Sequence, residues 1–596
     1  MISMRAARIW LLVAALSGAG AASVVRARDR ESGSAPSRPE DALVVSSIVP
    51  ARAGGTIVVG SLADPKSLNT TIANETSSTE VTHRIFDNLV EIDCATLEYL
   101  PGLAKSWEVS RDGRRWTFHL RRGVVWADGV PFTADDVLFT FRAIYDSTTA
   151  SPIRDGLTID GEPFRVTKED DNTVVIETTK TFGPMLHALA TSAEIVPRHL
   201  WEDALAKGRM AEALGIDTPP GLVVGTGPFR LEKREPGRTV LARNPRYWKF
   251  DREGTRLPYA DRVVFVSAGD YETWRLKFEA REVDHYLVRP EEVDEMRARS
   301  AEGGYRVVDL GPRLGTVHFW LNQNPGRDEK GSPFVDPKKL AWFRDLRFRR
   351  ALAHAIDRNA IVQTVYRGYG VPIRGPISPG DLRWYNPDLP DHPYDPARSR
   401  ALLAEIGFRD ADGDGFLEDL DGAPVAFTFH TNVENRVRVN IGHLIESDLA
   451  AVGVRATLAP LDFNSLVTAI HETGRYEACL LSVVSSGDPS SGLNVWLSRG
   501  ASHEFHPRQK SPDTDWEREV DSLVVASVTT ADFAERKRLF DRVQTLFAEN
   551  LGFIYLANDE IFLAIRDRFV NLRPGRLRAF NEFLWNEDEI AIRAAP

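Results

Sequence analysis

Short strand-like segments alternate with amphipathic helical segments along almost the whole chain, and this alternation constrains the fold more than any other feature. The strand candidates are residues 55–61, 116–120, 173–178, 263–266, 316–321, 426–431 and 553–556. The helix candidates are residues 133–145, 345–365, 396–406, 435–452 and 532–550. The first group consists of short apolar runs or of apolar residues at every second position, as in 116–120, and the second has apolar residues at helical spacing. The pattern predicts a mixed α/β fold.

Composition and charge exclude several classes of protein. The chain has 596 residues, of which 43% are hydrophobic and 27% charged, so it can bury several cores and is not disordered. It carries 74 Lys and Arg against 85 Asp and Glu, a net charge of −11. Nucleic-acid or anionic-membrane binding needs a clustered basic excess, so neither partner is expected. Cys94 and Cys479 allow at most one disulfide, which excludes a disulfide scaffold and a Cys-rich zinc site.

The first 27 residues have the layout of a secretory signal peptide. Arg5 and Arg8 precede an apolar run at 9–16, and small residues follow it. The whole apolar stretch at 9–25, interrupted by Ser and Gly, is short for a membrane span of ~20 residues, so we expect export to the periplasm without a membrane anchor. Ala19 stands where a bacterial lipoprotein has its lipid-bearing Cys, so no lipid anchor is expected either. Residues 28–53, rich in Ser, Pro, Arg and Ala, are predicted to form a flexible leader.

Several blocks, in one order along the chain, carry a family resemblance. They are IFDNLVEI at 85–92, the segment 100–144, GTGPFRLEKREPG at 225–237, RNPRYW at 243–248, the segment 343–370, WEREVDSL at 516–523 and the segment 535–556. Together they resemble bacterial extracellular solute-binding protein family 5, whose members serve peptide, dipeptide and nickel ABC importers. One block could match by chance, but an ordered set along the mature chain is specific.

The resemblance implies a two-lobed periplasmic-binding-protein fold with two chain crossings and an extra N-terminal subdomain. We expect lobe I at 54–312, with the subdomain at about 75–220, lobe II at 313–552, and a return to lobe I at 553–596. The implied function is a monomeric periplasmic receptor that captures an oligopeptide or another small solute in the interlobe cleft. It would deliver this solute to the permease of an ABC importer, and closure of the lobes would follow binding.

An enzymatic function is not indicated. The sequence contains no G-x-S-x-G, no H-E-x-x-H and no Walker-type glycine loop. An exported hydrolase with an unrecognised site and a chaperone-like binder of unfolded segments remain as alternatives. No cofactor is required by the expected function.

The segment 480–497 is similar to the family's cleft segment. In that family an Asp three residues before an Asp/Glu-Pro pair commonly takes the α-ammonium of a peptide, and here that position is Ser485. A neutral hydroxyl cannot supply a charge-assisted hydrogen bond to an ammonium, which puts the usual dipeptide anchor in doubt. Asp488 is a substitute, although it also suits an Asp-Pro turn. Asn494 is a further candidate polar group.

Aromatic side chains near the expected cleft are candidates for stacking against the solute. They are Tyr271, Trp274, Trp384, Tyr385 and Trp496. Trp384 and Trp496 are favoured because each lies in a loop rich in Gly, Pro, Asn or Ser rather than on a periodic apolar face. Core packing is the alternative for each of them.

An acidic run at 410–421 follows the spacing of a calcium-binding loop. Asp410, Asp412 and Asp414 occupy positions 1, 3 and 5, the Phe416 carbonyl occupies position 7, and Asp421 occupies position 12. Gly415 stands at position 6, where the loop turns sharply. Position 12 is Asp instead of the usual Glu, which lowers the expected affinity. The interpretation is a structural Ca²⁺ site, with an ion-free acidic hairpin as the alternative.

Overall fold

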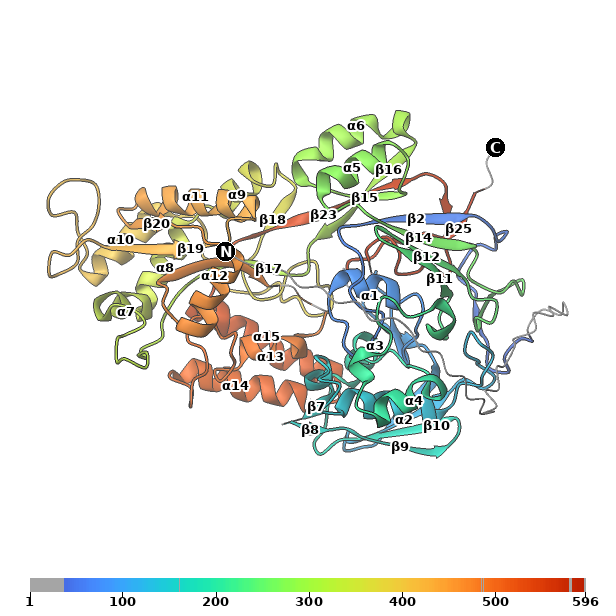
Figure 1. Cartoon of the computed structure of the whole chain (residues 1–596). Coiled ribbons are helices and arrows are strands. Elements are labelled where there is room, and N and C mark those ends of the chain that lie inside the picture. Colours follow the sequence, from blue (N-terminus) through green and yellow to red (C-terminus); the bar gives the residue numbers. More distant parts are fainter. Residues whose placement is uncertain (1–36, 160, 484, 486, 578–580, 594–596) are drawn as a thin grey trace, which may run out of the picture. The chain divides into compact units, whose positions relative to one another are not determined.

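The structure is a computed structural model that describes residues 37–159, 161–483, 485, 487–577 and 581–593. The predicted signal peptide and residues 28–36 of the predicted leader therefore lie outside the described residues. Within the described part of the chain, no helix combines the length and the apolar character that a membrane span requires. The predicted mixed α/β fold is confirmed, and the elements form two lobes (Figure 1).

Two four-stranded sheet units and two helices build the main body of the first lobe. In one unit β14 pairs parallel with β2, and the remaining neighbours are antiparallel. Its strands, in order, are β11 (Phe229–Glu235), β12 (Arg238–Arg243), β14 (Arg262–Ser267) and β2 (Thr56–Ser61). The other unit is antiparallel and consists of β15 (His285–Val288), β23 (Ala557–Arg566), β16 (Tyr305–Pro312) and β18 (Gly370–Pro372). Helices α5 (Tyr271–Glu279) and α6 (Val293–Gly303) share one hydrophobic core with both units.

An additional sheet with its own core forms the subdomain of the first lobe. Its antiparallel strands, in order, are β5 (Ala104–Val109), β6 (Arg115–Leu120), β10 (Thr173–Glu177) and β9 (Arg165–Asp170). Helices α2 (Ala134–Tyr145), α3 (Met185–Thr191) and α4 (Arg198–Ala206) belong to the same part of the chain. Asp136 accepts a hydrogen bond from the Thr133 N–H at 3.0 Å, so the start of α2 is capped.

Short elements complete the first lobe. They are β1 (Leu43–Val45), α1 (Thr76–Thr82), β3 (Val90–Ile92), β4 (Tyr99–Pro101), β7 (Thr158–Ile159), β8 (Glu162–Pro163), β13 (Lys249–Asp251), β24 (Phe569–Val570) and β25 (Ala591–Ile592). Strand β1 pairs parallel with β13, which corrects the prediction that all of 28–53 is a flexible leader. The three consecutive apolar residues at 43–45 form a short strand that the Ser- and Pro-rich composition of the segment did not indicate.

A mixed five-stranded sheet forms the centre of the second lobe. Its strands, in order, are β20 (Arg455–Leu458), β19 (Ala426–His430), β21 (Ala478–Val483), β17 (Thr316–Leu321) and β22 (Ile554–Tyr555). Strand β19 is parallel to β20 and β21, whereas β17 is antiparallel to β21 and β22. Side chains alternate between two cores, with Phe319 on one face and Trp320 on the other.

Helices cover both faces of this sheet. The Phe319 face packs against α7 (Pro337–Arg344), α8 (Leu346–Ala355), α9 (Arg358–Thr364), α10 (Pro396–Ile406) and α11 (Arg436–Ala450). The Trp320 face packs against α12 (Phe463–Val467), α13 (Leu493–Trp496), α14 (Asp515–Val528) and α15 (Phe533–Asn550). The helix predicted at 345–365 is divided into α8 and α9 because Ile356 is extended and Asp357 caps the second helix, accepting from the Asn359 and Ala360 N–H groups.

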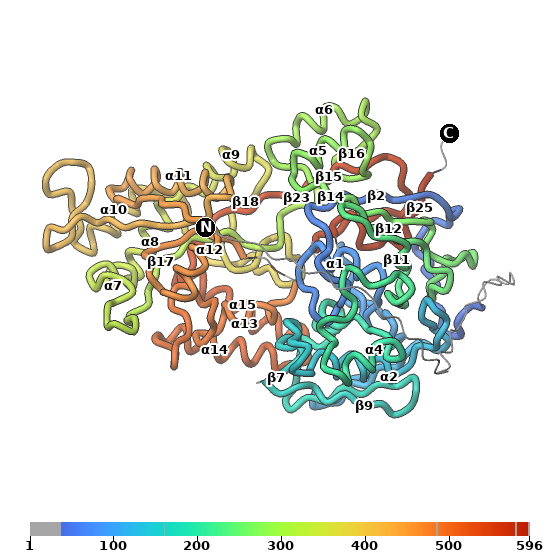
Figure 2. The backbone as a smooth tube through the Cα atoms, viewed as in Figure 1, coloured from blue at the N-terminus to red at the C-terminus, as the bar shows by residue number. Residues whose placement is uncertain are grey.

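The chain passes between the two lobes at two neighbouring places. Strand β16 ends at Pro312 and β17 begins at Thr316, while β22 ends at Tyr555 and β23 begins at Ala557. Figure 2 shows the red C-terminal segment returning beside the blue β2, where Arg568 donates to the Thr56 carbonyl at 2.8 Å. The lobe boundaries at 312/313 and 552/553 stay predictions, because a boundary between lobes is defined by which residues move as one body.

Both cysteines have unpaired thiols and are buried. Cys94 lies in the core of the subdomain and Cys479 in a core of the second lobe. The one disulfide that the sequence allows is therefore not formed in this structure.

Asp87, a buried residue of the first lobe, predicts a dependence of stability on pH. Burial raises the pKa of Asp87 to about 7, although the Trp248 indole N–H, which donates to its carboxylate at 2.8 Å, acts in the opposite direction. The unfolded carboxyl titrates near its ordinary value of 3.8, so folding favours the protonated form. This stability is fully present below about pH 4 and is lost as pH rises towards 7.

We therefore expect Asp87→Asn to flatten the pH dependence of the free energy of unfolding. Between pH 5 and 7 the wild-type protein should lose about 2 kcal/mol more than the variant, since one unit of pKa corresponds to about 1.4 kcal/mol. Urea unfolding at the two pH values measures this difference. Asp217→Asn, at an exposed position, is the control and should follow the wild type. Equal slopes for wild type and Asp87→Asn would contradict the prediction.

Candidate functional site

A cavity of ≈ 1050 Å³ is lined by residues of the first lobe, the subdomain, the crossings and the second lobe. Tyr271 and residues 287–291 come from the first lobe, and Phe182, Pro184 and His187 come from the subdomain. Residues 313–317 belong to one crossing and Asn558, Asp559 and Ile561 to the other. The second lobe contributes Asn435, Arg438, Ser482, Ser485, Ser490 and Ser491. A solute in this cavity would contact both lobes at once.

The sheet of the second lobe explains why its polar side chains reach the cavity. Strands β19 and β21 are parallel, so their carboxyl ends lie at the same edge of the sheet. The chain after β19 leads to the start of α11 at Asn435 and Arg438, and β21 ends beside Ser482. Ligands of α/β sheets commonly bind at this edge. Arg438 Nη1 donates to Ser482 Oγ at 3.3 Å, while its Nε is buried without a hydrogen-bond partner among the described residues.

Among the described residues, eight ionic side chains line the cavity, four of each sign. They are Asp155, Glu291, Asp559, Glu582, Arg289, Arg313, Arg438 and Arg576. Arg313 forms a bidentate ion pair with Asp559, at 3.1 and 2.9 Å. Arg576 Nη1 donates to the Gly380 carbonyl at 2.9 Å. Arg438 forms no ion pair within the part of the chain that the structure describes, and the charge of Glu434 acts on it only from a longer distance.

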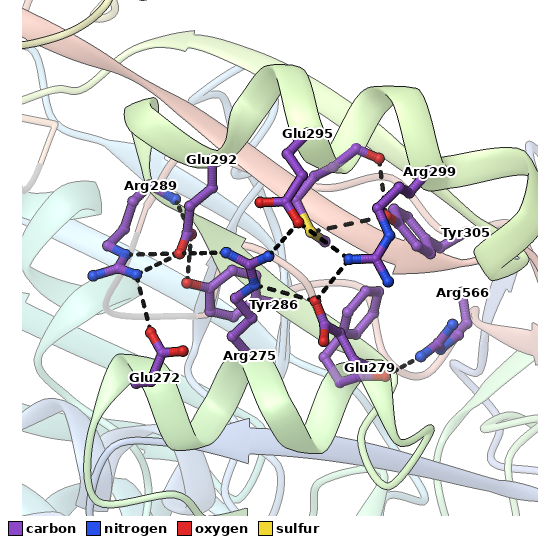
Figure 3. A network of polar contacts seen from close by, with 12 residues as sticks. Glu272, Arg275, Glu279, Tyr286, Arg289, Glu292, Glu295, Arg299, Tyr305 and Arg566 are labelled. Atoms are coloured by element: carbon purple, nitrogen blue, oxygen red, sulfur yellow. Dashed lines mark hydrogen bonds and ion pairs between the residues drawn. The ribbon is translucent and has the colours of Figure 1, made fainter.

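Arg289 is held in the cavity wall by a network between α5 and α6 (Figure 3). Its guanidinium pairs with Glu292 and, at 3.3 Å, with Glu272. Arg275 extends the network to Glu292 and Glu295, at 3.3 and 2.7 Å. Burial acts to raise the pKa of Glu292. The hydrogen bonds from Arg289 and the Tyr286 hydroxyl act more strongly in the opposite direction, so the pKa lies below its usual value. The charge of Arg289 is thereby compensated within the protein.

Ser485 borders the cavity, whereas Asp488 does not. Asp488 is buried, and its two carboxylate oxygens both accept from Arg536 Nη2 on α15, at 3.0 and 3.1 Å. Burial raises the pKa of Asp488, but the Arg536 charge holds it below the ordinary value. Asp488 also accepts from the Ser490 N–H at 2.9 Å, which caps the turn at Pro489–Gly492. Its role in the structure is to fix the loop that carries Ser490 and Ser491.

The predicted aromatic contacts are largely corrected by the structure. Only Tyr271 lines the main cavity. Trp274 donates to the His285 carbonyl at 2.9 Å in the core of the first lobe, and Trp384 is fully buried against Phe533 and Phe540. Buried indole rings cannot stack against a solute. Local loop composition does not reveal that a loop folds back onto a core, which is why Trp384 was preferred as a contact although it is buried.

The remaining residues of the predicted cleft segment lie beside the main cavity. Trp496 is buried, donates to the Pro489 carbonyl at 2.9 Å, and borders a smaller cavity of ≈ 100 Å³ together with Ser485 and Asp488. Asn494 is exposed and lines neither cavity. The sequence analysis did not single out Arg438. Asn435, which caps the helix that follows β19, could have indicated that the first turn of this helix lies at the carboxyl edge of the sheet, where Arg438 is placed.

The acidic loop folds as a hairpin after α10. Carboxylate oxygens of Asp410, Asp412 and Glu418 lie within 4.8 Å of one another. Asp414 instead pairs with Arg455 at 3.0 Å and Asp421 with Lys338 at 2.8 Å, while the Phe416 ring lies 4.2 Å from the Arg455 guanidinium. Isolated β-bridges join Glu418 to Arg409 and to Pro424 and turn the chain back. Glu418, rather than Asp421, therefore lies beside Asp410 and Asp412. Occupation by Ca²⁺ stays a prediction.

The fold and the cavity define a two-lobed solute-binding protein. The family model described as "Bacterial extracellular solute-binding proteins, family 5 Middle" matches residues 98–504, which is more than half of the chain. The chain belongs to this family. The predicted membership is thereby confirmed.

Individual relatives agree with the family. A "Probable ABC transporter-binding protein" of Deinococcus radiodurans is 27% identical, with 86% of this chain and 89% of that protein covered. A "Dipeptide-binding protein" of Escherichia coli is 27% identical, with 81% and 85% covered. Among solved structures, the ABC transporter substrate-binding protein CtaP of Listeria monocytogenes has a TM-score of 0.74 at 20% identity, covering 91% of this chain and 100% of that one.

Removal of the Arg536 side chain is expected to destabilise the protein. Arg536→Ala leaves the Asp488 carboxylate buried without its cation, which costs about 3–5 kcal/mol. Urea unfolding measures the change, and Arg538→Ala, on the exposed face of the same helix, should cost less than about 0.5 kcal/mol. Combining Arg536→Met with Asp488→Asn should recover part of the loss. A cost below 1 kcal/mol for Arg536→Ala would show that the pair is not important for the fold.

Calcium is expected to raise the melting temperature relative to the protein in a chelator. At a concentration 100-fold above Kd the gain corresponds to about 2.7 kcal/mol. Asp412→Ala and Glu418→Gln should abolish the response, whereas Asp421→Asn should retain it because Asp421 pairs with Lys338. Superimposable melting curves of the wild type with calcium and with chelator would leave the ion-free hairpin as the explanation.

Proposed function

We propose that this protein captures a peptide-like solute in the cavity between its lobes and delivers it to the permease of an ABC importer. The observation that carries the proposal is the ≈ 1050 Å³ cavity whose lining comes from both lobes and includes the uncompensated Arg438. Its volume lies at the upper end of the range of about 300–1,000 Å³ for small-molecule sites. Space of this size, with serine hydroxyls and a cation on its wall, suits a short peptide.

Arg438 is the residue proposed to take the carboxylate of the solute. It lies in the first turn of α11, a helix of 15 residues whose unpaired N–H groups and dipole favour a negative charge. The guanidinium can donate two parallel hydrogen bonds to a carboxylate. The Ser482 hydroxyl at 3.3 Å orients the side chain without neutralising it.

Closure of the lobes around the solute is supported by direct contacts between the second lobe and the subdomain. Arg536 Nη1 donates to the Gly183 carbonyl at 3.2 Å, and Arg383 Nη1 donates to the Leu97 carbonyl at 2.6 Å. Gly183 approaches the Thr530 carbonyl so closely that a Cβ atom would lie 2.0 Å from it. Contacts of this kind exist only when the lobes are together, so a solute that binds both lobes shifts the population towards this state.

Export to the periplasm, absence of a lipid anchor and a non-enzymatic, monomeric mode of action are parts of the same proposal. The family is one of extracellular solute-binding proteins, and the relative from Deinococcus radiodurans has a name that refers to an ABC transporter. The relative from Escherichia coli is named for dipeptides. A receptor that releases its solute unchanged needs no catalytic group, and turnover of peptide or ester substrates by the purified protein would contradict this part.

Binding of defined peptides tests the proposal. Short peptides with a free carboxylate should raise the melting temperature and bind about 10- to 100-fold more tightly than the same peptides with an amidated C-terminus, since a charge-assisted hydrogen bond is worth about 1.5–3 kcal/mol. Arg438→Gln should remove this difference. Arg436→Gln, on the exposed side of the same helix, is the matched control. Native mass spectrometry of the purified protein should detect a co-purified peptide, and failure of all peptides to bind would refute the proposed solute class.

A further inference from the structure

Glu582 is a buried carboxylate in the cavity wall that forms no ion pair among the described residues, although the charge of Arg313 acts on it from a longer distance. Its residue is only 8% exposed, and it lines the cavity. Oε1 is buried without a hydrogen-bond partner, and among the described residues the side chain forms no ion pair. The backbone carbonyl of Glu582, in contrast, accepts from the Gly575 N–H at 2.8 Å. The main chain at this residue is therefore anchored while the carboxylate is not.

The turn that carries Glu582 is held on both sides. Asn581 adopts a left-handed conformation, with φ of 62°, and its side chain accepts from the Phe583 N–H at 3.1 Å and donates to Glu80 at 3.1 Å. The Phe583 ring stacks on His285 at 4.5 Å between centroids. Since both neighbours are fixed, the position of Glu582 is set before a solute enters, which lowers the cost of binding.

No other acidic residue of the cavity wall is in this situation. Asp559 is neutralised by Arg313, while Asp155 and Glu291 are exposed to solvent. Asp488, the acid that the sequence offered in place of Ser485, is neutralised by Arg536 away from the main cavity. Glu582 is thus the one buried carboxylate among the described residues of the lining that forms no ion pair and has an oxygen without a hydrogen bond.

A buried carboxylate without hydrogen bonds costs free energy that a bound cation would recover. We propose that Glu582 binds a cationic nitrogen group of the solute, such as the α-ammonium of a peptide or another protonated amine. The proposal rests on the proposed function in that it assigns a second contact in the same cavity. It supplies the carboxylate that is missing at Ser485 from a different part of the chain.

Glu582 and Arg438, which form no ion pair among the described residues, lie on different lobes. Glu582 belongs to the C-terminal return, where Phe583 and Leu584 join the core of the first lobe. Arg438 belongs to α11 of the second lobe. A solute that carries both an ammonium and a carboxylate would therefore bind one lobe with each end, and its differential affinity for the closed state would drive closure. The preferred solute class is zwitterionic.

The test compares Glu582→Gln with the wild type in calorimetric titrations. Three probes are used: a pool of free-amine tri- to pentapeptides, the same pool N-acetylated, and a pool of free amino acids and polyamines. The wild type should bind the free-amine peptides about 10- to 100-fold more tightly than the acetylated ones, and Glu582→Gln should lose this difference. Glu302→Gln, an exposed position on α6 outside the cavity, is the matched control and should bind as the wild type does.

The outcomes separate this inference from the proposed function. If free and acetylated peptides bind the wild type equally, peptide binding stands and the role of Glu582 is refuted. If no peptide binds but the amine pool does, and Glu582→Gln loses that binding, the solute class is refuted and the cation site stands. If no pool binds, or if Glu582→Gln binds every pool like the wild type, the cation site is refuted.

Stability without solute gives a second readout. An unpartnered buried carboxylate destabilises the solute-free protein, so Glu582→Gln should melt at the same or a higher temperature than the wild type, while its binding of free-amine peptides falls. If Glu582 instead stabilised the fold, Glu582→Gln would lower the melting temperature. A melting temperature clearly lower than those of the wild type and Glu302→Gln would show that Glu582 supports the fold, and would overturn the proposal.

Discussion

The structure depends on the place where the chain crosses twice between the lobes. Arg313 of the first crossing and Asp559 of the second are joined by a bidentate ion pair, and the Asn558 side chain donates to the Arg313 carbonyl at 3.1 Å. These contacts tie two segments that are about 245 residues apart in the sequence. The same residues line the cavity, so the segments that connect the lobes also form part of the cavity wall. Any solute that fills the cavity acts directly on the crossing.

Most charged side chains around the cavity are paired within the protein, and this decides which of them can bind a solute. Arg289 is neutralised by a network on α5 and α6, Arg313 by Asp559, and Asp488 by Arg536. Such pairs fix loops and helices but offer little to a solute, since an ion that is already paired gains less from a new partner. The proposed recognition therefore uses two lining groups that form no ion pair among the described residues, Arg438 and Glu582, while Arg576, also without an ion pair, is tied to the Gly380 carbonyl. Arg438 is a cation at a helix start, and Glu582 is an anion in a turn whose neighbours Asn581 and Phe583 are anchored.

The fold could be predicted from the sequence to a large extent. The alternation of strands and helices, the capped start of α2 and the ordered family blocks all indicated the α/β architecture that the structure has. The break between α8 and α9 was missed because apolar spacing continues through Ile356, while the cap at Asp357 acts on the backbone. The preference for Trp384 failed for a related reason, since the exposure of a loop residue depends on what packs against the loop. The proposed contact of Trp496 with the solute stays a prediction.

By itself, the sequence determined the family, the α/β class and the candidates for polar contacts, because these follow from local periodicity, turn chemistry and ordered motifs. Only the tertiary structure decided which charges are available. Asp488 lies 48 residues from Arg536, and Asp559 lies 246 from Arg313, so their pairing depends on the path of the whole chain. In the sequence Glu582 resembles many other acids, and only its position in the cavity wall, buried and without an ion pair among the described residues, makes it a candidate. The energy of a charge is set by its surroundings in space, and those surroundings exist only after folding.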